Sequence, residues 1–192
     1  MSLDLIGTLA SVGTFLVIGA TAAAAAIQLR HMRASNQLSA LLDLEHEFRS
    51  PELQDSFRFV EHDLADRLRD RAYRDELERI GFIDARAHQE INALNWFDEM
   101  GAVLKNRLVD ENAFMDLFSR LAVQHWEALA PAISILRRRR GRGQSINFEY
   151  LAIRARAWVS RHPEGVIPKN AERIPMRDEW LAEDSGESMP IR

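Results

Sequence analysis

The feature that most constrains this sequence is a charge-free segment near its N-terminus. Between Asp4 and Arg30 lie 25 residues, Leu5 to Leu29, without one charged side chain. As a helix this segment would measure about 37 Å, which exceeds the roughly 30 Å hydrocarbon core of a bilayer. Its first half is strongly apolar and its second half contains an alanine run, Ala22 to Ala26. The segment therefore predicts a single membrane-spanning helix.

A cleaved signal peptide is the alternative to this anchor, because the small residues Ala24 to Ala26 would suit a signal peptidase. Signal peptides begin with a positive region, however, and the only charged side chain before this segment is Asp4. The basic residues Arg30, His31 and Arg33 follow the segment, and basic flanks stay in the cytoplasm. We therefore expect a single-pass protein with its N-terminus outside and its C-terminal part in the cytoplasm.

Small residues recur along the predicted span. Gly7, Gly13 and Gly19 are spaced six positions apart, and Gly19 and Ala23 are four apart. Such spacings let two membrane helices approach closely, so a homo-oligomer is one interpretation. A generic alanine-rich span is the other.

The rest of the chain predicts an all-α domain. After Leu29 apolar residues recur at helical spacing, without the alternation and turn signals of hairpins. The membrane helix is expected to continue to Arg49, because Ser50-Pro51-Glu52 supplies an N-cap, a proline at the first helical position and an early acidic residue. The predicted organisation is a transmembrane anchor and juxtamembrane segment at 1–33, a cytoplasmic helical bundle at 34–163, and a polar, largely extended tail at 164–192.

Four further helical stretches are expected in this bundle. Residues 51–80 carry an apolar stripe that loses phase near Asp70, so they form one bent helix or two short ones. Asp84 is expected to cap a third long helix. The fourth contains Pro131, and the fifth ends near His162. The apolar stripes of these helices predict which residues are buried. Among them are Ile80, Leu108, Leu117, Trp126, Ile153 and Trp158.

These elements together predict the fold class. We expect an all-α protein in which a single N-terminal transmembrane helix is continuous with an antiparallel cytoplasmic bundle of about four to five helices.

The sequence lacks most motifs of known catalytic or metal-binding chemistry. The chain has no cysteine, which excludes disulfides, thiolate zinc sites and cysteine nucleophiles. It also lacks the nucleophile elbow, the phosphate-binding loop, the zinc-protease motif and the dinucleotide fingerprint. His46 and His62 each lie beside acidic residues, but a metal site needs at least three converging ligands. We therefore predict no metal, cofactor or catalytic residue, and interpret these histidines as part of a solvated polar face.

Two other groups of polar residues are interpreted as packing features. Asn92, Asn95 and Glu99 lie at helical spacing on one predicted helix, which favours interhelical hydrogen bonding. His125 beside Trp126 is interpreted as a half-buried packing residue.

The strongest single feature after the span is a run of arginines. Five cations in six residues can attract anionic lipid or nucleic acid. The run contains no interleaved aromatic residue and the net charge is −4, so nucleic acid is not favoured. A solvated helix end, where cations suit the helix dipole, is the other interpretation. If successive helices reverse direction, the run would lie near the membrane beside Arg30 and Arg33. The candidate lipid-binding residues are Arg137, Arg138, Arg139, Arg140 and Arg142.

The order of these features resembles a known family. The resemblance rests on the sequence FRSPEL at 48–53, NWFDE at 95–99, WEALAP at 126–131, and an arginine-rich stretch leading to Tyr150. In these features the chain is similar, from about Gln28 to Trp158, to a bacterial domain-of-unknown-function family of small, N-terminally membrane-anchored all-helical proteins. The resemblance implies a one-span protein of the bacterial inner membrane, and it brings no functional residues with it.

The function expected from these features is that of a membrane-tethered helical interaction or regulatory module. Its partners would be the lipid bilayer, anionic lipid, and either a cytosolic protein or a second copy of the chain. The alternative is a hydrolytic enzyme of unrecognised type, built on acids and histidines of the bundle. A pocket lined by His46, His62 and a third ligand would favour the enzyme, and a fully packed bundle would favour the module.

Overall fold

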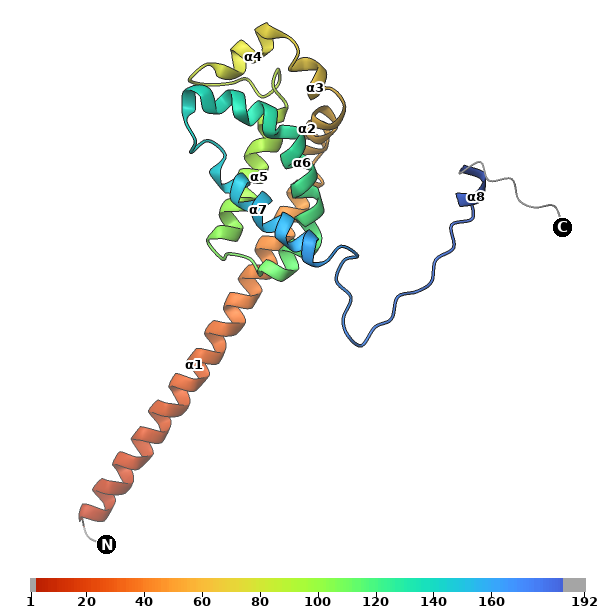
Figure 1. Ribbon diagram of the computed structural model, residues 1–192. Coiled ribbons are helices and arrows are strands. Elements are labelled where there is room, and N and C mark those ends of the chain that lie inside the picture. The colour runs from red at the N-terminus through yellow and green to blue at the C-terminus, as the bar shows by residue number, and fades with distance from the viewer. Residues whose placement is uncertain (1–2, 185–192) are drawn as a thin grey trace, which may run out of the picture.

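The structure is a computed structural model that describes residues 3–184. Over that range it contains eight helices and no strand, which confirms the all-α prediction. Figure 1 shows α2 to α7 gathered into a bundle at one end of the long helix α1. The helices are α1 (Leu3–Phe48), α2 (Pro51–His62), α3 (Leu64–Arg67), α4 (Arg71–Glu78), α5 (Glu90–Lys105), α6 (Glu111–Arg140), α7 (Ile146–Arg161) and α8 (Leu181–Asp184).

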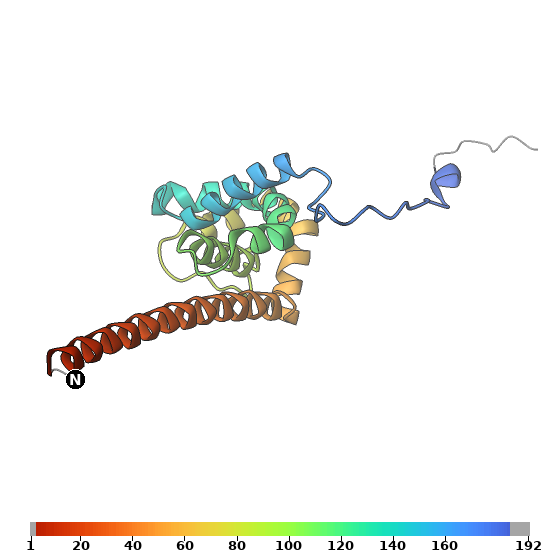
Figure 2. The ribbon, with the colours of Figure 1, turned by 90° about the horizontal axis from the view of Figure 1, so that it is seen from below.

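The apolar helix α1 is long enough to cross a membrane. Judged by length and composition, its part from Ser11 to Phe48 is a candidate span, and the same test would also admit a signal sequence. Figures 1 and 2 show that this helix projects from the bundle and that only its C-terminal end lies against other elements. Its apolar side chains are accordingly exposed, for example Phe15 at 76% and Leu16 at 64%.

The junction between α1 and α2 forms where the sequence predicts it. Ser50 has an extended backbone and its hydroxyl accepts a hydrogen bond from the Leu53 amide, while Pro51 takes the first helical position. The Gln54 side chain donates to the Phe48 carbonyl at 2.6 Å. The start of α2 is therefore capped by Ser50, and the end of α1 is closed by the side-chain hydrogen bond from Gln54.

Phe48 packs the end of α1 against the bundle. Its ring lies 5.6 Å from the ring of Phe57, 5.7 Å from that of Trp96 and 6.2 Å from that of Phe118, measured between centroids. These partners come from α2, α5 and α6, so one aromatic side chain connects the long helix to three others.

The stretch 51–80 is divided further than predicted. It forms three helices, α2, α3 and α4, instead of one bent helix or two short ones. Asp63 separates the first two, and Asp70 caps α4 by accepting a hydrogen bond from the Ala72 amide at 2.9 Å. The loss of phase near Asp70 was therefore one of two breaks.

The start of α5 differs from the prediction. Asp84 does not cap this helix, which begins at Glu90. The Asp84 carboxylate accepts from the Arg86 amide at 3.0 Å, and its carbonyl accepts from the amides of Ala87 and His88. Asp84 thus closes a turn, as aspartates do when their side chains bond the backbone two residues on.

Several positions predicted as buried are exposed. Ile80 lies beyond the end of α4 and Leu108 beyond the end of α5, so helical phase no longer applies to them. Leu117 and Ile153 lie on outer faces of their helices, each at 60% exposure. Trp126 and Trp158 are half-buried and pack against the core, rather than within it.

The centre of the bundle is the contact between α5 and α7. Phe97 of α5 and Phe148 of α7 are fully buried and stack with their ring centroids 4.7 Å apart. Gly101 permits this approach, because a Cβ atom there would lie 2.1 Å from the Asn147 carbonyl oxygen. Asp98 also accepts hydrogen bonds from the amides of Asn147 and Phe148, at 3.0 and 2.9 Å, and so caps α7 from the neighbouring helix.

The chain after α7 leaves the bundle. Residues 162–180 contain no helix, and Figures 1 and 2 show them running away from the other elements to the four-residue helix α8. The Arg120 guanidinium donates to the Pro163 carbonyl and holds the start of this stretch. The predicted tail, 164–192, extends past the described residues, since 185–192 lie outside them. The predicted domain boundaries stay predictions.

Candidate functional site

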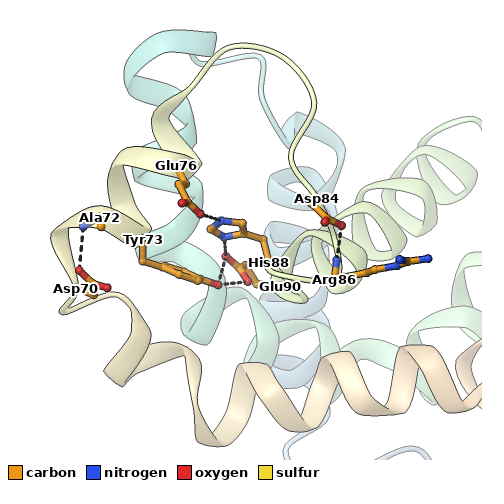
Figure 3. Close-up of polar contacts among 8 residues, drawn as sticks. All are labelled: Asp70, Ala72, Tyr73, Glu76, Asp84, Arg86, His88 and Glu90. Atoms are coloured by element: carbon orange, nitrogen blue, oxygen red, sulfur yellow. Dashed lines mark hydrogen bonds and ion pairs between the residues drawn. The ribbon is translucent and has the colours of Figure 1, made fainter.

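A buried polar network connects α4 to the start of α5 (Figure 3). The Tyr73 hydroxyl donates to the Glu90 carboxylate, with its oxygen 2.6 and 2.8 Å from the two carboxylate oxygens. His88 Nδ1 lies 3.1 Å from Glu90 Oε1, and His88 Nε2 lies 3.0 Å from Glu76 Oε2. Tyr73, His88 and Glu90 are buried, whereas the Glu76 side chain is half exposed.

The contacts of His88 require one proton more than a neutral imidazole between two ionised carboxylates supplies. A neutral imidazole carries one N–H, but both ring nitrogens of His88 face carboxylate oxygens, which accept when ionised. Either His88 is an imidazolium, or one carboxyl group carries the proton. Glu90 also begins α5, where the helix dipole favours negative charge. Burial first, and then the hydrogen bond to Glu90, raise the pKa of Tyr73, so its phenol stays neutral.

Local structure brings these side chains together. The Asp70 cap starts α4 and places Tyr73 on its inner face, next to Leu77, which is fully buried. The Asp84 turn then holds the His88 backbone just before α5. The ring centroids of Tyr73 and His88 are 4.3 Å apart, so the two rings also pack on each other. The network therefore joins a short helix and a turn to the core. Such a network is rigid when its buried polar groups are hydrogen-bonded.

The burial of the network limits its chemistry. His88 is 2% exposed and Glu90 is 0% exposed, so a substrate would reach only the half-exposed Glu76. Among the described residues no group of three or more histidines and carboxylates could hold a metal ion. The arrangement therefore supports a structural role for these groups.

The arginine run lies at the end of the bundle remote from the N-terminus of α1. Figure 1 shows the C-terminal end of α6 beside α4, at the opposite end of the molecule from the apolar helix. The expected placement beside Arg30 and Arg33 is therefore wrong. Its cause is the corner at Ser50-Pro51, after which α2, α3 and α4 continue away from α1 instead of returning along it.

Most of these arginines have protein partners. Arg137 contacts Glu149 at 2.6 Å, Arg138 and Arg139 contact Glu78 at 3.3 and 3.1 Å, and Arg140 donates to the carbonyls of Arg79 and Gly81. Hydrogen bonds from Arg139 and then Arg138 hold the pKa of Glu78 below its ordinary value. Arg142 is exposed in the loop after α6. Lipid binding by Arg137, Arg138, Arg139, Arg140 and Arg142 stays a prediction.

The histidines singled out from the sequence do not form a site. His46 and His62 are exposed near the ends of different helices, α1 and α2. His125 is more deeply buried than expected, and its ring lies 4.7 Å from that of Phe57 and 5.1 Å from that of Phe97. Burial lowers the pKa of His125, so this residue packs in the core as a neutral imidazole.

The polar residues of α5 form few of the expected interhelical hydrogen bonds. The Asn92 side chain lies 3.5 Å from the Ser56 hydroxyl, at the outer limit of a hydrogen bond. Asn95 and Glu99 are exposed and face a surface groove together with Trp96. These residues therefore belong to a surface feature rather than to a buried network.

Sequence reasoning missed the network of Tyr73, His88 and Glu90. A histidine two positions before a glutamate, just after a turn, was the one local signal for it. Tyr73 lies 17 positions before Glu90, and helical periodicity explains it as an apolar residue.

The fold and the buried network define a class of protein. It is an all-helical bundle, held by a polar cluster on one side and carried on a long N-terminal apolar helix. Residues 15–155 match the family described as a domain of unknown function, DUF4760, and the chain belongs to this family. No curated protein and no solved structure matches the chain.

Proposed function

We propose that this protein is a membrane-tethered helical interaction or regulatory module. The observation that supports the proposal most is the unbroken course of α1 from its apolar part to Phe48, which packs among Phe57, Trp96 and Phe118. A helix that is continuous between a membrane and a folded bundle sets the distance between the two. The bundle would then present its charged surfaces at a constant height above the membrane.

We further propose that the apolar part of α1 spans a bacterial inner membrane once, with the N-terminus outside. Arg30, His31 and Arg33 follow this part, and such basic residues favour the cytoplasmic side. The lipid bilayer is then one partner, and a cytosolic protein or a second copy of the chain is the other. The hydrolytic alternative has no comparable support, because His46 and His62 lie exposed on different helices.

Fractionation of the full-length protein tests the tether. Wild-type protein should stay with membranes after carbonate extraction. The double variant Leu16→Arg and Ile18→Arg should be released, since each central arginine costs about 2.5–3.5 kcal/mol in membrane insertion. Retention of the variant would show that another part of the chain holds it to the membrane.

Crosslinking in isolated membranes tests the interaction. The wild-type chain should give a discrete product of higher mass, and the released variant should give less of it because the tether no longer concentrates the bundle at the membrane. A wild-type chain that stays with membranes and crosslinks to nothing would contradict an interaction module.

A further inference from the structure

A surface hollow lies where the end of α4 meets the C-terminal end of α6. It has a volume of about 460 Å³ and is lined by Asp75, Glu78, Arg79, Ile80 and Arg139. Ile80 is 78% exposed, so the hollow has an apolar wall that is open to solvent. Arg140 holds this loop against α6, because its guanidinium donates to the carbonyls of Arg79 and Gly81.

The acidic residues of the hollow already have partners. Arg138 and Arg139 share the single carboxylate of Glu78, at 3.3 and 3.1 Å. Asp75 lies 3.8 Å from Arg71 of its own helix. The carboxylates that line the hollow therefore do not balance the remaining arginines.

Positive charge is in excess at this end of the bundle. Arg140 contacts backbone carbonyls, and the exposed side chains of Arg79 and Arg142 have no ion pair or hydrogen bond within residues 3–184. One glutamate, Glu78, thus faces five arginines, which are Arg79, Arg138, Arg139, Arg140 and Arg142. A segment with several acidic side chains is therefore favoured here.

The tail of the same chain contains a segment of complementary chemistry. Residues 178–184 read DEWLAED, with four acidic residues and no basic one. Trp180 in this segment is 65% exposed. A guanidinium stacks favourably on a tryptophan ring, which is the best aromatic partner for a cation. The segment therefore offers negative charge for the arginines and an aromatic ring for the wall at Ile80.

The tail is long enough to bring this segment to the hollow. It leaves the bundle at Pro163, whose carbonyl accepts a hydrogen bond from Arg120. At about 1.5 Å per residue, α7 separates this point from the arginine run by about 24 Å. An extended chain from Pro163 to Asp178 spans up to about 50 Å, roughly twice that length. The contact between Arg173 and Glu164 would have to open, and such exposed ion pairs contribute little.

We propose that residues 178–184 bind in this hollow within the same chain and cover the cationic end of the bundle. Trp180 then packs between Ile80 and the guanidinium of Arg139, and the acidic side chains pair with the arginines that have no carboxylate. Figures 1 and 2 show the tail in the released arrangement. A segment on the same chain acts at a millimolar effective concentration, so modest contacts suffice. The tail thereby competes with any acidic partner for this end of the bundle.

The two other polyanions considered for the arginine run fit the hollow less well. A membrane crossed by α1 would lie at the opposite end of the molecule in Figure 1. A nucleic-acid strand would supply charge, but Ile80 provides no aromatic ring on which its bases could stack.

The test uses the full-length protein in detergent micelles and an end-capped, fluorescently labelled peptide of residues 178–184. The tail variant, with Asp178→Asn, Glu179→Gln and Trp180→Ala, frees the hollow in the intact chain. This variant should bind the peptide about tenfold more tightly than wild type, whose own tail occupies the hollow. Binding should weaken as salt rises. A peptide in which alanine replaces Trp180 should bind several-fold more weakly.

Two pairs of substitutions in the tail variant locate the binding. Arg79→Gln with Arg139→Gln should weaken peptide binding several-fold. Arg107→Gln with Arg156→Gln removes the same charge from surfaces outside the hollow, and should change binding by less than about twofold.

Each outcome decides the proposal. Equal affinity of wild type and the tail variant would show that the tail does not occupy the hollow. Equal weakening by the two arginine pairs would show nonspecific attraction and overturn the site. If the affinity of wild type for the peptide falls as its own concentration rises, the segment comes from a second copy and the contact within one chain is wrong. Fractionation and crosslinking do not use the hollow, so a failure here would leave the proposed function standing.

Discussion

Tyr73→Phe is the sharpest perturbation of the buried network, because it removes one oxygen and keeps the ring. The hydroxyl lies 2.6 and 2.8 Å from the oxygens of Glu90, which is fully buried. Without it, His88 is the remaining side-chain partner of Glu90 within the described residues. A hydrogen bond contributes about 0.5–1.5 kcal/mol between neutral groups and about 1.5–3 kcal/mol when one group is charged, and a buried group that loses its partner costs about 1–3 kcal/mol. We expect a loss of about 2 kcal/mol, or about 4–8 °C in Tm for a chain of this size.

The measurement is thermal and urea unfolding of the full-length protein in micelles, followed by circular dichroism near neutral pH. Tyr150→Phe is the matched control, because the Tyr150 hydroxyl has no hydrogen-bond partner in the part of the chain that the structure describes. The control should change the free energy of unfolding by less than about 0.5 kcal/mol. Equal effects of the two substitutions would refute the contribution assigned to the network.

The pH dependence of the same variant provides a second readout. Burial raises the pKa of Tyr73 above the ordinary tyrosine value of about 10, so the folded state keeps a proton that the unfolded state releases. Unfolding then releases a proton above that pH, and stability falls as pH rises further. Wild type should lose stability in this alkaline range more steeply than Tyr73→Phe. Parallel alkaline profiles would contradict the assignment.

Three further predictions concern the core. Gly101→Ala should destabilise the protein by about 3 kcal/mol, because its Cβ would overlap the Asn147 carbonyl; Gly143→Ala, with open space around it, should be neutral or slightly stabilising in the same urea titration. Asp98→Ala should cost about 2–4 kcal/mol, since it removes an acceptor from two amides at the start of α7, and an unchanged midpoint would contradict that cap. The pKa of His125 is lowered by burial, so the unfolded chain binds the extra proton and stability falls below about pH 6.5. His125→Phe should flatten this acid decline, and a decline as steep as in wild type would place its origin elsewhere.

Local signals predicted the parts of the fold that depend on local chemistry. The cap at Ser50-Pro51 ended α1 as expected, and the run from Asp110 to Gly141 formed the long helix α6, because caps and periodicity act within a few residues. The second break in 51–80, at Asp63, has no proline or glycine and was not predicted. The aspartate turn at Asp84 was mistaken for a cap, since both use the same side-chain hydrogen bond.

Contacts between distant segments could not be predicted in this way. Asp98 caps a helix that begins 48 positions later, and Tyr73 pairs with a glutamate in the next long helix. The misplacement of the arginine run has a related cause. Counting helix reversals assumes that each connection is a hairpin, whereas the connection at Ser50 is a corner. Such geometry depends on packing among Phe48, Phe57 and Trp96 rather than on the linking residues.

The tether is tested most directly by labelling single cysteines in sealed membranes, because the natural chain has none. Leu16 and Leu42 are both exposed in the protein, at 64% and 54%, so only a surrounding membrane would distinguish them. We predict that Leu42→Cys reacts with a water-soluble maleimide on the cytoplasmic side, and that Leu16→Cys stays protected until detergent is added. Equal labelling of the two cysteines in intact membranes would contradict a membrane-spanning α1.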